Sequence, residues 1–530
     1  MEEIAPAQTR SSLQTTSPSR FSKWYFYCIL IFAISLPFSK FGLSVSQFLI
    51  LIIWVVERDF RNKWRALVSN PIALGLISIY LIHLIGLAYS QDFDYAMKDL
   101  RIKMPLLSFT IFASWIFPLE RKYINQILNI FSLAVLVGVF IAFYRIFFIA
   151  LDDIREASIF VSHIRFSLMI CTAIFIAFYN VIRAYHQYFY LALALFLIGS
   201  LFILESITGL IVLSAAAFFL SIYLTINRKG KTLGLSLTAL FLIAISIASF
   251  QLKKEFDVFY SYEAISDPST LEYASASGEV YYHKIESTLH ENGTLIWSYI
   301  AFKELEKAWI KKSELGFKEQ DAKGQPVYST LIRYMSSKGL RKDSIDFLRL
   351  SEADIELIEM GHTNHLYANN SSIKKRVYET LWEIENLKNG RNPEGNSVAQ
   401  RLVFWATGWQ IFKENFWLGV GTGDVKVAFE KAYEAGNTEL STQFRHRAHN
   451  QYLSIAIAFG LFGLLFFLFF YFKPLYFQRD NLLLLLFLIC SGMSFLSEDT
   501  IETQIGISYI VFFYCLFGMN KFSWKAQHKA

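Results

Sequence analysis

Apolar stretches of near-bilayer length recur at both ends of the chain, and short polar loops separate them. A membrane-crossing helix needs about 20 predominantly apolar residues, and some of these stretches are slightly shorter. The pattern predicts about twelve transmembrane helices, near residues 24–39, 42–56, 71–89, 104–118, 124–150, 164–182, 187–204, 207–226, 232–250, 450–472, 481–497 and 504–520. The chain is therefore expected to be an all-α polytopic membrane protein.

One long polar segment interrupts this pattern between the ninth and tenth predicted helices. Within it, residues 301–315 and 371–387 place apolar side chains at spacings of three and four, which is typical of amphipathic helices. We interpret the lysine-rich face of the first stretch as a solvated helix surface; it comprises Lys303, Lys307, Lys311 and Lys312. The segment is thus predicted to form a large helical domain.

The alternation of apolar and polar segments divides the chain into five parts. The first residues are rich in Ser, Thr and Gln, a composition typical of disorder. The parts are a disordered tail (1–22), nine transmembrane helices (23–250), the loop domain (251–448), three transmembrane helices (449–520) and a second tail (521–530).

The distribution of lysine and arginine predicts the orientation in the membrane. Basic residues are concentrated in alternate loops, for example at 58–65, 121–122 and 228–231, and again after residue 520. Cytoplasmic loops carry the excess of positive charge. Both termini are therefore expected in the cytoplasm and the loop domain on the opposite side.

The overall composition agrees with a membrane protein. Apolar residues make up 54% of the chain, aromatic residues 17% and charged residues only 18%. The net charge of +6 is too modest to suggest nucleic-acid binding, and we attribute it to topology. All four cysteines fall in predicted spans, which excludes a disulfide framework or thiolate metal site in the loop domain; they are Cys28, Cys171, Cys490 and Cys515.

A basic, histidine-bearing cluster immediately precedes the tenth predicted helix. It contains Arg445, His446, Arg447 and His449. Such charges either anchor a helix end at the membrane surface or meet the headgroup of a lipid-linked substrate.

The residues that follow carry a resemblance. His449 and Asn450 are followed after nine residues by Gly460, and then by Gly463. This pattern resembles the signature of the O-antigen ligase and O-antigen polymerase family, integral-membrane glycosyltransferases that use undecaprenyl-diphosphate-linked sugars. The resemblance implies a fold like that of C-type glycosyltransferases.

The stretch before this cluster, residues 396–433, is similar to the family's segment upstream of the histidine. An amphipathic helix ends in Gly419–Gly423, and Asp424 is a plausible N-cap of the next helix. A dinucleotide site is rejected because no strand precedes these glycines, so they suggest an interhelical turn whose amides could still meet a phosphate. The resemblance implies that Arg401 binds the donor diphosphate; the alternative is a solvent-facing arginine.

Other charged residues at the outer membrane face are weaker candidates. Arg165, beside His163, and Arg145 lie at outer ends of spans, where they either snorkel or bind substrate. The family commonly has an arginine after a serine where this chain has Ser206 and then Ile207, so we take Arg165 as a substitute.

The last outer loop contains three carboxylates. We interpret Glu498 and Asp499 as solvated loop charges. Glu502, followed by Thr-Gln-Ile-Gly, resembles the family's pattern and is a supporting candidate together with Asn450, either orienting His449 or binding acceptor hydroxyls. His362 and His365 have metal-like spacing, but one pair is a weak signal, and we predict no metal site and no cofactor.

The resemblance implies glycan transfer from undecaprenyl diphosphate to an acceptor hydroxyl, in lipopolysaccharide biosynthesis most simply that of lipid A-core. The reaction would occur at the periplasmic face of the bacterial inner membrane. His449 is the expected base, and Arg401, Arg445, Arg447 and Arg165 are the expected diphosphate ligands, with no metal required.

Three alternatives stay open at this point. An O-antigen polymerase and a protein O-oligosaccharyltransferase would share this chemistry. A transporter would instead show inverted repeats and charged sites at mid-membrane, whereas the unusual residues here gather at the outer face. The acceptor, the sugar and the oligomeric state are not determined by the sequence.

Overall fold

The computed structural model describes residues 21–149, 151, 153–183, 185–226, 231–261, 268–284, 286–367, 373–436, 438, 440–520 and 522. Most of the two predicted tails therefore lies outside the described residues. The chain forms two compact units, of which the first combines Met1–Leu237 with Arg401–Ala530 and the second is Thr238–Gln400. Helices α11 (Lys231–Tyr260) and α17 (Ser397–Glu414) contain the two unit boundaries.

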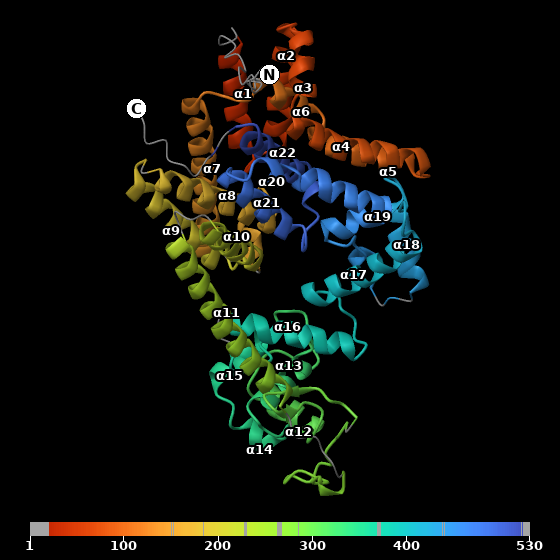
Figure 1. Ribbon diagram of the computed structural model, residues 1–530. Coiled ribbons are helices and arrows are strands. Elements are labelled where there is room, and N and C mark those ends of the chain that lie inside the picture. Colours follow the sequence, from red (N-terminus) through yellow and green to blue (C-terminus); the bar gives the residue numbers. More distant parts are fainter. Residues whose placement is uncertain are drawn as a thin grey trace, which may run out of the picture. The chain divides into compact units, whose positions relative to one another are not determined.

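The first unit consists of helices throughout its described part (Figure 1). Its elements are α1 (Ser22–Ser35), α2 (Lys40–Val56), α3 (Phe60–Val68), α4 (Pro71–Gly86), η1 (Leu87–Tyr89), α5 (Phe93–Lys103), η2 (Met104–Leu106), α6 (Ser108–Ile116), α7 (Arg121–Phe148), η3 (Ile154–Ala157), α8 (His163–Ile182), α9 (Gln187–Ile203), α10 (Ile207–Ile226), α18 (Val425–Ala435), η6 (Thr442–Phe444), α19 (Gln451–Phe472), α20 (Pro474–Phe477), α21 (Leu482–Ser494), η7 (Thr500–Glu502) and α22 (Gln504–Gly518).

Within the described residues, six helical segments are long and apolar enough to cross a membrane. They are Pro71–Tyr89, Arg121–Phe148, His163–Ile182, Ile207–Ile226, Gly234–Tyr260 and Gln451–Phe477. Each coincides with a predicted span, so the chain is a multi-pass, largely helical membrane protein. The other six predicted spans overlap shorter apolar helices, namely α1, α2, α6, α9, α21 and α22, and the count of twelve stays a prediction.

Polar side chains define where several of these helices begin. The Asn70 side chain accepts from the amides of Ile72 (3.0 Å) and Ala73 (3.2 Å), and Pro71 occupies the first position of α4. Asp92 caps α5 in the same way, accepting from the Tyr95 amide at 2.9 Å. Such caps satisfy amides that have no partner within the helix.

The C-terminal helices form the interior of the first unit. Every residue of α22 from Ile505 to Gly518 is buried, as expected for a helix that is apolar on all sides. Figure 1 shows α22 (blue) beside N-terminal helices, and it contacts α6, α2 and α4 as well as α21. The two ends of the sequence are thus packed together, and this brings the loop before α22 to the chain segment around α5.

The second unit is a small, mainly helical domain. Its elements are η5 (Pro268–Thr270), β1 (His290–Glu291), β2 (Thr294–Leu295), α12 (Phe302–Ile310), α13 (Val327–Ser337), α14 (Ser344–Phe347), α15 (Glu352–Glu359) and α16 (Ile373–Lys388). Helices α12 and α16 confirm the two predicted amphipathic stretches, and the four lysines of the first are exposed. The strands pair antiparallel across Asn292 and Gly293, both with positive φ, which a tight hairpin turn requires.

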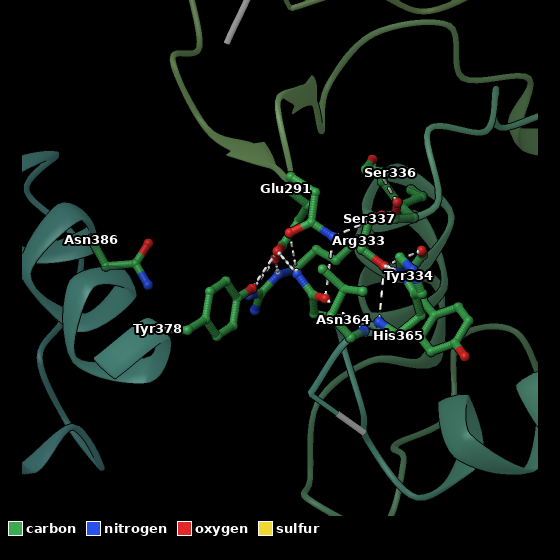
Figure 2. Close-up of polar contacts among 12 residues, drawn as sticks. Glu291, Arg333, Tyr334, Ser336, Ser337, Asn364, His365, Tyr378 and Asn386 are labelled. Carbon is green, nitrogen blue, oxygen red and sulfur yellow. Dashed lines mark hydrogen bonds and ion pairs between the residues drawn. The ribbon is translucent and has the colours of Figure 1, made fainter. Parts of the chain in front are cut away.

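A buried polar network lies inside this domain (Figure 2). The carboxylate of Glu291 accepts from Arg333 Nη2 (2.7 Å) and Nε (2.9 Å) and from Asn364 Nδ2 (2.8 Å), and the Tyr378 hydroxyl also donates to it. The Glu291 side chain is 0% exposed. A buried charge is stable only when it is paired and hydrogen-bonded, so this network fixes β1, α13 and α16 to one another.

Candidate active site

His449 lies immediately before the first turn of α19. The next residue, Asn450, is the N-cap: its side-chain oxygen accepts from the Leu453 amide at 3.1 Å, and its Nδ2 donates to the Leu496 carbonyl at 3.1 Å. Asn450 therefore fixes the start of α19 against the loop that precedes α22. Its expected role in supporting the chemistry stays a prediction.

His449 itself has a left-handed backbone with φ +46°. Residues other than glycine adopt this region at an energetic cost, and such strain is maintained only where surrounding contacts hold it. The contact here comes from Asp499, whose Oδ2 accepts from the His449 amide at 3.1 Å. Asp499 Oδ1 accepts from the Ser454 hydroxyl at 2.8 Å, one turn into α19.

Helix α17 supplies the other side of the histidine. The rings of Phe404 and His446 each lie 5.9 Å from the His449 ring, measured between centroids. Arg401, one turn before Phe404 on α17, adds a positive charge close enough to affect the histidine. Burial lowers the pKa of His449 below its usual 6.5, Asp499 opposes this, and Arg401, His446 and Arg447 reinforce it. The imidazole is thus neutral at pH 7.

A second set of charges surrounds Glu502. Its carboxylate accepts from Lys103 Nζ (2.7 Å), Arg447 Nη1 (3.1 Å) and Gln451 Nε2 (3.0 Å). Lys103 also donates to Asp99 at 2.5 Å, one turn earlier on α5. Burial by itself would raise the pKa of Glu502, but Lys103 and Arg447 outweigh it and hold that pKa well below its ordinary value. Glu502 is therefore an ionised group that binds the two cations.

These charges line a cleft in the first unit. Its empty volume is about 300 Å³, open solvent included, and its polar walls are His83, Tyr95, Asp99, Lys103, Thr422, Arg447, Ser454 and Glu502. Arg447 reaches it from the segment before His449, and its Nη1 also donates to the Tyr95 hydroxyl at 3.2 Å.

The remaining predicted arginines are held by nearby groups. Arg165 Nη2 donates to Glu498 at 2.5 Å and Nη1 to the Ser162 hydroxyl at 3.2 Å. Because Glu498 adjoins Asp499, this ion pair ties the N-terminal end of α8 to the segment that holds His449. Arg445 Nε donates to the Leu440 carbonyl at 2.9 Å.

The structure corrects our interpretation of Glu498 and Asp499 as solvated loop charges. They are only 7% and 5% exposed, and each has a specific partner. The loop is short, and it leads into α22, which packs inside the unit. The loop therefore lies against α8 and α19, and these helices bury its carboxylates.

The glycine turn between α17 and α18 is not a phosphate cradle. All five of its amides already donate within the protein, from Gly419 to the Asn415 carbonyl, Val420 to Ile457, Gly421 to Ala458, Thr422 to Gly86 and Gly423 to the Ser90 hydroxyl. Asp424 does not cap α18 with its side chain; the carboxylate accepts instead from the amides of Gln91 and Asp92, at 2.9–3.0 Å. The glycines form a tightly packed turn between two helices, as we predicted from their position between them.

The structure shows why the family-like pattern has a glycine at position 460. Gly460 interrupts α19 with φ +64°, and the Leu461 amide donates to the Phe416 carbonyl at 2.7 Å. A Cβ at this position would lie 2.2 Å from the Trp417 main chain, so only glycine lets the end of α17 pack there.

Sequence reasoning missed Lys103, Asp99, Tyr95 and Gln451 as parts of the site. Helix α5 buries Asp99 and Lys103 on one face, together with Ala96 and Leu100. A lysine and an aspartate four residues apart on the apolar face of a helix is a signal that could have identified them. In the described residues, no group of three or more His, Cys, Asp or Glu side chains could hold a metal ion, and His365 instead contacts the Ser337 hydroxyl at 3.1 Å.

The comparison with known families covers part of this site. Residues 362–468 match the family model described as O-antigen ligase. Over this range the chain is similar to that family, whose members are glycosyltransferase-type enzymes. No curated protein shows significant similarity to the chain.

The matched range includes Arg401, Arg445, Arg447 and His449. It begins at residue 362, before the stretch 396–433 in which we found the first resemblance upstream of the histidine. It ends within α19, before Glu502.

Proposed function

We propose that the protein transfers a glycan from undecaprenyl diphosphate to an acceptor hydroxyl, that of lipid A-core in the simplest case. The observation that carries the proposal is the placement of His449. Burial and neighbouring cations keep its imidazole neutral, and Arg401 and Arg447 lie close enough to contribute to that effect. A neutral base beside fixed positive charge suits a reaction in which a hydroxyl loses a proton and a diphosphate departs.

The bond changes follow from this arrangement. The acceptor oxygen attacks the anomeric carbon and gives its proton to His449. The bond from the anomeric carbon to the diphosphate oxygen breaks, and undecaprenyl diphosphate leaves with the electron pair. Guanidinium groups bind phosphate oxygens through paired N–H donors and stay charged at any physiological pH. Arg401 and Arg447 are the proposed ligands of the departing diphosphate, with Arg445 and Arg165 nearby, and these cations make a metal unnecessary.

The proposed reaction also implies where the site lies relative to the membrane. Lipid-linked glycans are large polar groups on a membrane anchor, so the site must lie where a membrane helix meets water. His449 occupies such a position at the start of α19, an apolar helix of 22 residues. With the orientation predicted from loop charge, this is the periplasmic face of a bacterial inner membrane, and both termini are cytoplasmic.

A deletion strain tests the proposal. Lipopolysaccharide from the strain, with and without the wild-type gene, is separated on a gel, and undecaprenyl-diphosphate-linked glycan is measured in parallel. We expect deletion to remove the whole ladder and to cause long glycans to accumulate on the lipid carrier. Lipopolysaccharide with a single repeat unit would instead indicate a polymerase. An unchanged ladder would overturn the proposed acceptor and direct the search to glycoproteins.

A further inference from the structure

The carboxylate of Glu502 is shared between two cations that come from distant parts of the chain. Lys103 lies at the end of α5, and Arg447 lies just before His449; both donate to the same oxygen, Oε2, at 2.7 and 3.1 Å. The side chain of Glu502 is 6% exposed, so water screens these interactions little.

The two cations differ in their access to the cleft. The Lys103 side chain is 2% exposed and lies between Glu502 and Asp99, where it cannot reach a large substrate. The Arg447 side chain is 29% exposed. Its Nη1 is held by Tyr95 and Glu502, and within the described part of the chain Nε and Nη2 donate no hydrogen bond. One edge of the guanidinium is thus anchored while the other is available to an anion.

The charges explain why Lys103 matters for Arg447. A carboxylate that is bound to one arginine alone neutralises it and draws it into a closed pair. Here Lys103 shares Oε2 of Glu502 with Arg447, and Gln451 donates to Oε1, so Arg447 makes one contact of 3.1 Å instead of a closed two-bond pair. Burial alone would lower the pKa of Lys103, but Asp99 and Glu502 reverse the effect and raise it, so the lysine stays charged.

We propose that Lys103 is a positioning residue for glycan transfer: by occupying Glu502, it keeps the guanidinium of Arg447 oriented with one edge open, ready to bind the diphosphate of the donor. The inference rests on the proposed function, because it assigns a diphosphate to Arg447. Lys103 itself touches no substrate.

A charge-balanced pair of variants tests this role. Lys103→Met alone leaves two buried carboxylates with too little positive charge and endangers folding. The double variant Asp99→Asn/Lys103→Met removes one cation and one anion together. Of the two cations that contact Glu502, only Arg447 then remains. Asp99→Asn alone retains the bond from Lys103 to Glu502, and Lys98→Met changes an exposed lysine on the same helix. All four proteins are purified in detergent, checked for folding, and assayed with undecaprenyl-diphosphate-linked glycan and acceptor.

The expected result is specific to the donor. The double variant should raise the KM for the donor about tenfold, the effect of weakening one charge-assisted contact, and leave the KM for the acceptor unchanged. Lys98→Met should keep the wild-type donor KM, and the donor KM of Asp99→Asn should lie between that of Lys98→Met and that of the double variant.

Equal donor KM values in the double variant and Asp99→Asn would overturn the role of Lys103, and so would a change in kcat alone. If the double variant does not fold, the triple variant that adds Glu502→Gln removes the carboxylate onto which Arg447 would close, and its donor KM should lie close to that of the wild type. A donor KM about tenfold above wild type in a folded triple variant would reject the inference. A second failure to fold would assign Lys103 a purely structural role and would also reject it. If the wild-type protein itself transfers no glycan, the proposed function fails rather than this inference.

Discussion

Asp499 holds His449 by its main chain: the His449 amide donates to Asp499 Oδ2 at 3.1 Å, while the imidazole faces Phe404 and His446. The carboxylate thereby stabilises the left-handed conformation at φ +46° immediately before α19. The same carboxylate also acts on the imidazole through space, because it opposes the fall in the pKa of His449. Asp499 therefore has two separable effects, on geometry and on charge.

The geometric effect predicts that Asp499→Ala inactivates a folded protein. Without the acceptor, the strained backbone at His449 relaxes and the ring moves. A displacement of about 1 Å in a catalytic group can reduce the rate about 100-fold. Glycan transfer by membranes containing equal amounts of variant and wild type provides the measurement. Asp480→Ala, an exposed aspartate in the loop after α20, is the matched control and should retain full activity. Similar activities for the two variants would contradict the role of Asp499.

The electrostatic effect predicts a characteristic pH profile. A general base must be neutral, and the pKa of His449 is lowered from its usual value by burial, so kcat/KM should be level at neutral and alkaline pH and fall only on the acid side. Asp499 raises that pKa, and Asp499→Asn should therefore move the acid limb to still lower pH. The two profiles are compared between pH 4.5 and 8, in steps of about half a unit. An acid limb that moves to higher pH in the variant would show that the base is not His449.

Gly460 predicts a stability effect distant from the chemistry. An alanine there would need φ +64° and would place its Cβ 2.2 Å from the Trp417 main chain. Because main-chain atoms cannot rotate away, Gly460→Ala should separate α17 from α19 and lower the apparent melting temperature by about 5 °C or more. Gly199→Ala is the control, since nothing lies within 4 Å of a Cβ at that position. Equal melting temperatures for the two variants would show that the turn does not depend on glycine.

The network in the second unit allows a comparison of buried and exposed ion pairs. Arg333→Met leaves Glu291, whose side chain is 0% exposed, without its cation, and removing one partner of a buried pair costs about 3–5 kcal/mol. Hydrogen exchange measured on the full chain should therefore become faster in β1 and α13. Arg341→Met breaks a pair with Glu272 in which both side chains are largely exposed, and it should leave exchange nearly unchanged. Unchanged protection in Arg333→Met would mean that the network adds little stability.

Much of the fold could be predicted because a long, continuous run of apolar residues directly indicates a membrane-spanning helix. Spans such as 124–150 and 207–226 are continuous apolar runs, and the structure has helices at both. The short helices α6 and α21 are harder, since a run of 9 or 13 helical residues does not by itself establish a crossing. Asn450 and Gly460 were found through a pattern, and the structure supplies their physical roles as a cap and a helix break.

The charges of the site were predictable only in part. His449 and Arg447 lie two residues apart, so their proximity could be inferred directly. Lys103 and Glu502 are far apart in sequence, and only the packing of α22 against the N-terminal helices brings them together. The burial of Asp499 depends on the same packing. A charged residue in a short loop looks solvated until the fold shows what covers it.

The central claim is that the imidazole of His449 takes the proton of the acceptor. The most direct measurement compares glycan transfer by His449→Ala and His446→Ala, expressed to equal levels and assayed with the same lipid-linked donor and acceptor. His446 is exposed and lies three residues away, so it controls for loss of a nearby histidine. The account predicts that His446→Ala transfers glycan at close to the wild-type rate and that His449→Ala shows no detectable transfer. Full transfer by a correctly folded His449→Ala protein would contradict the account.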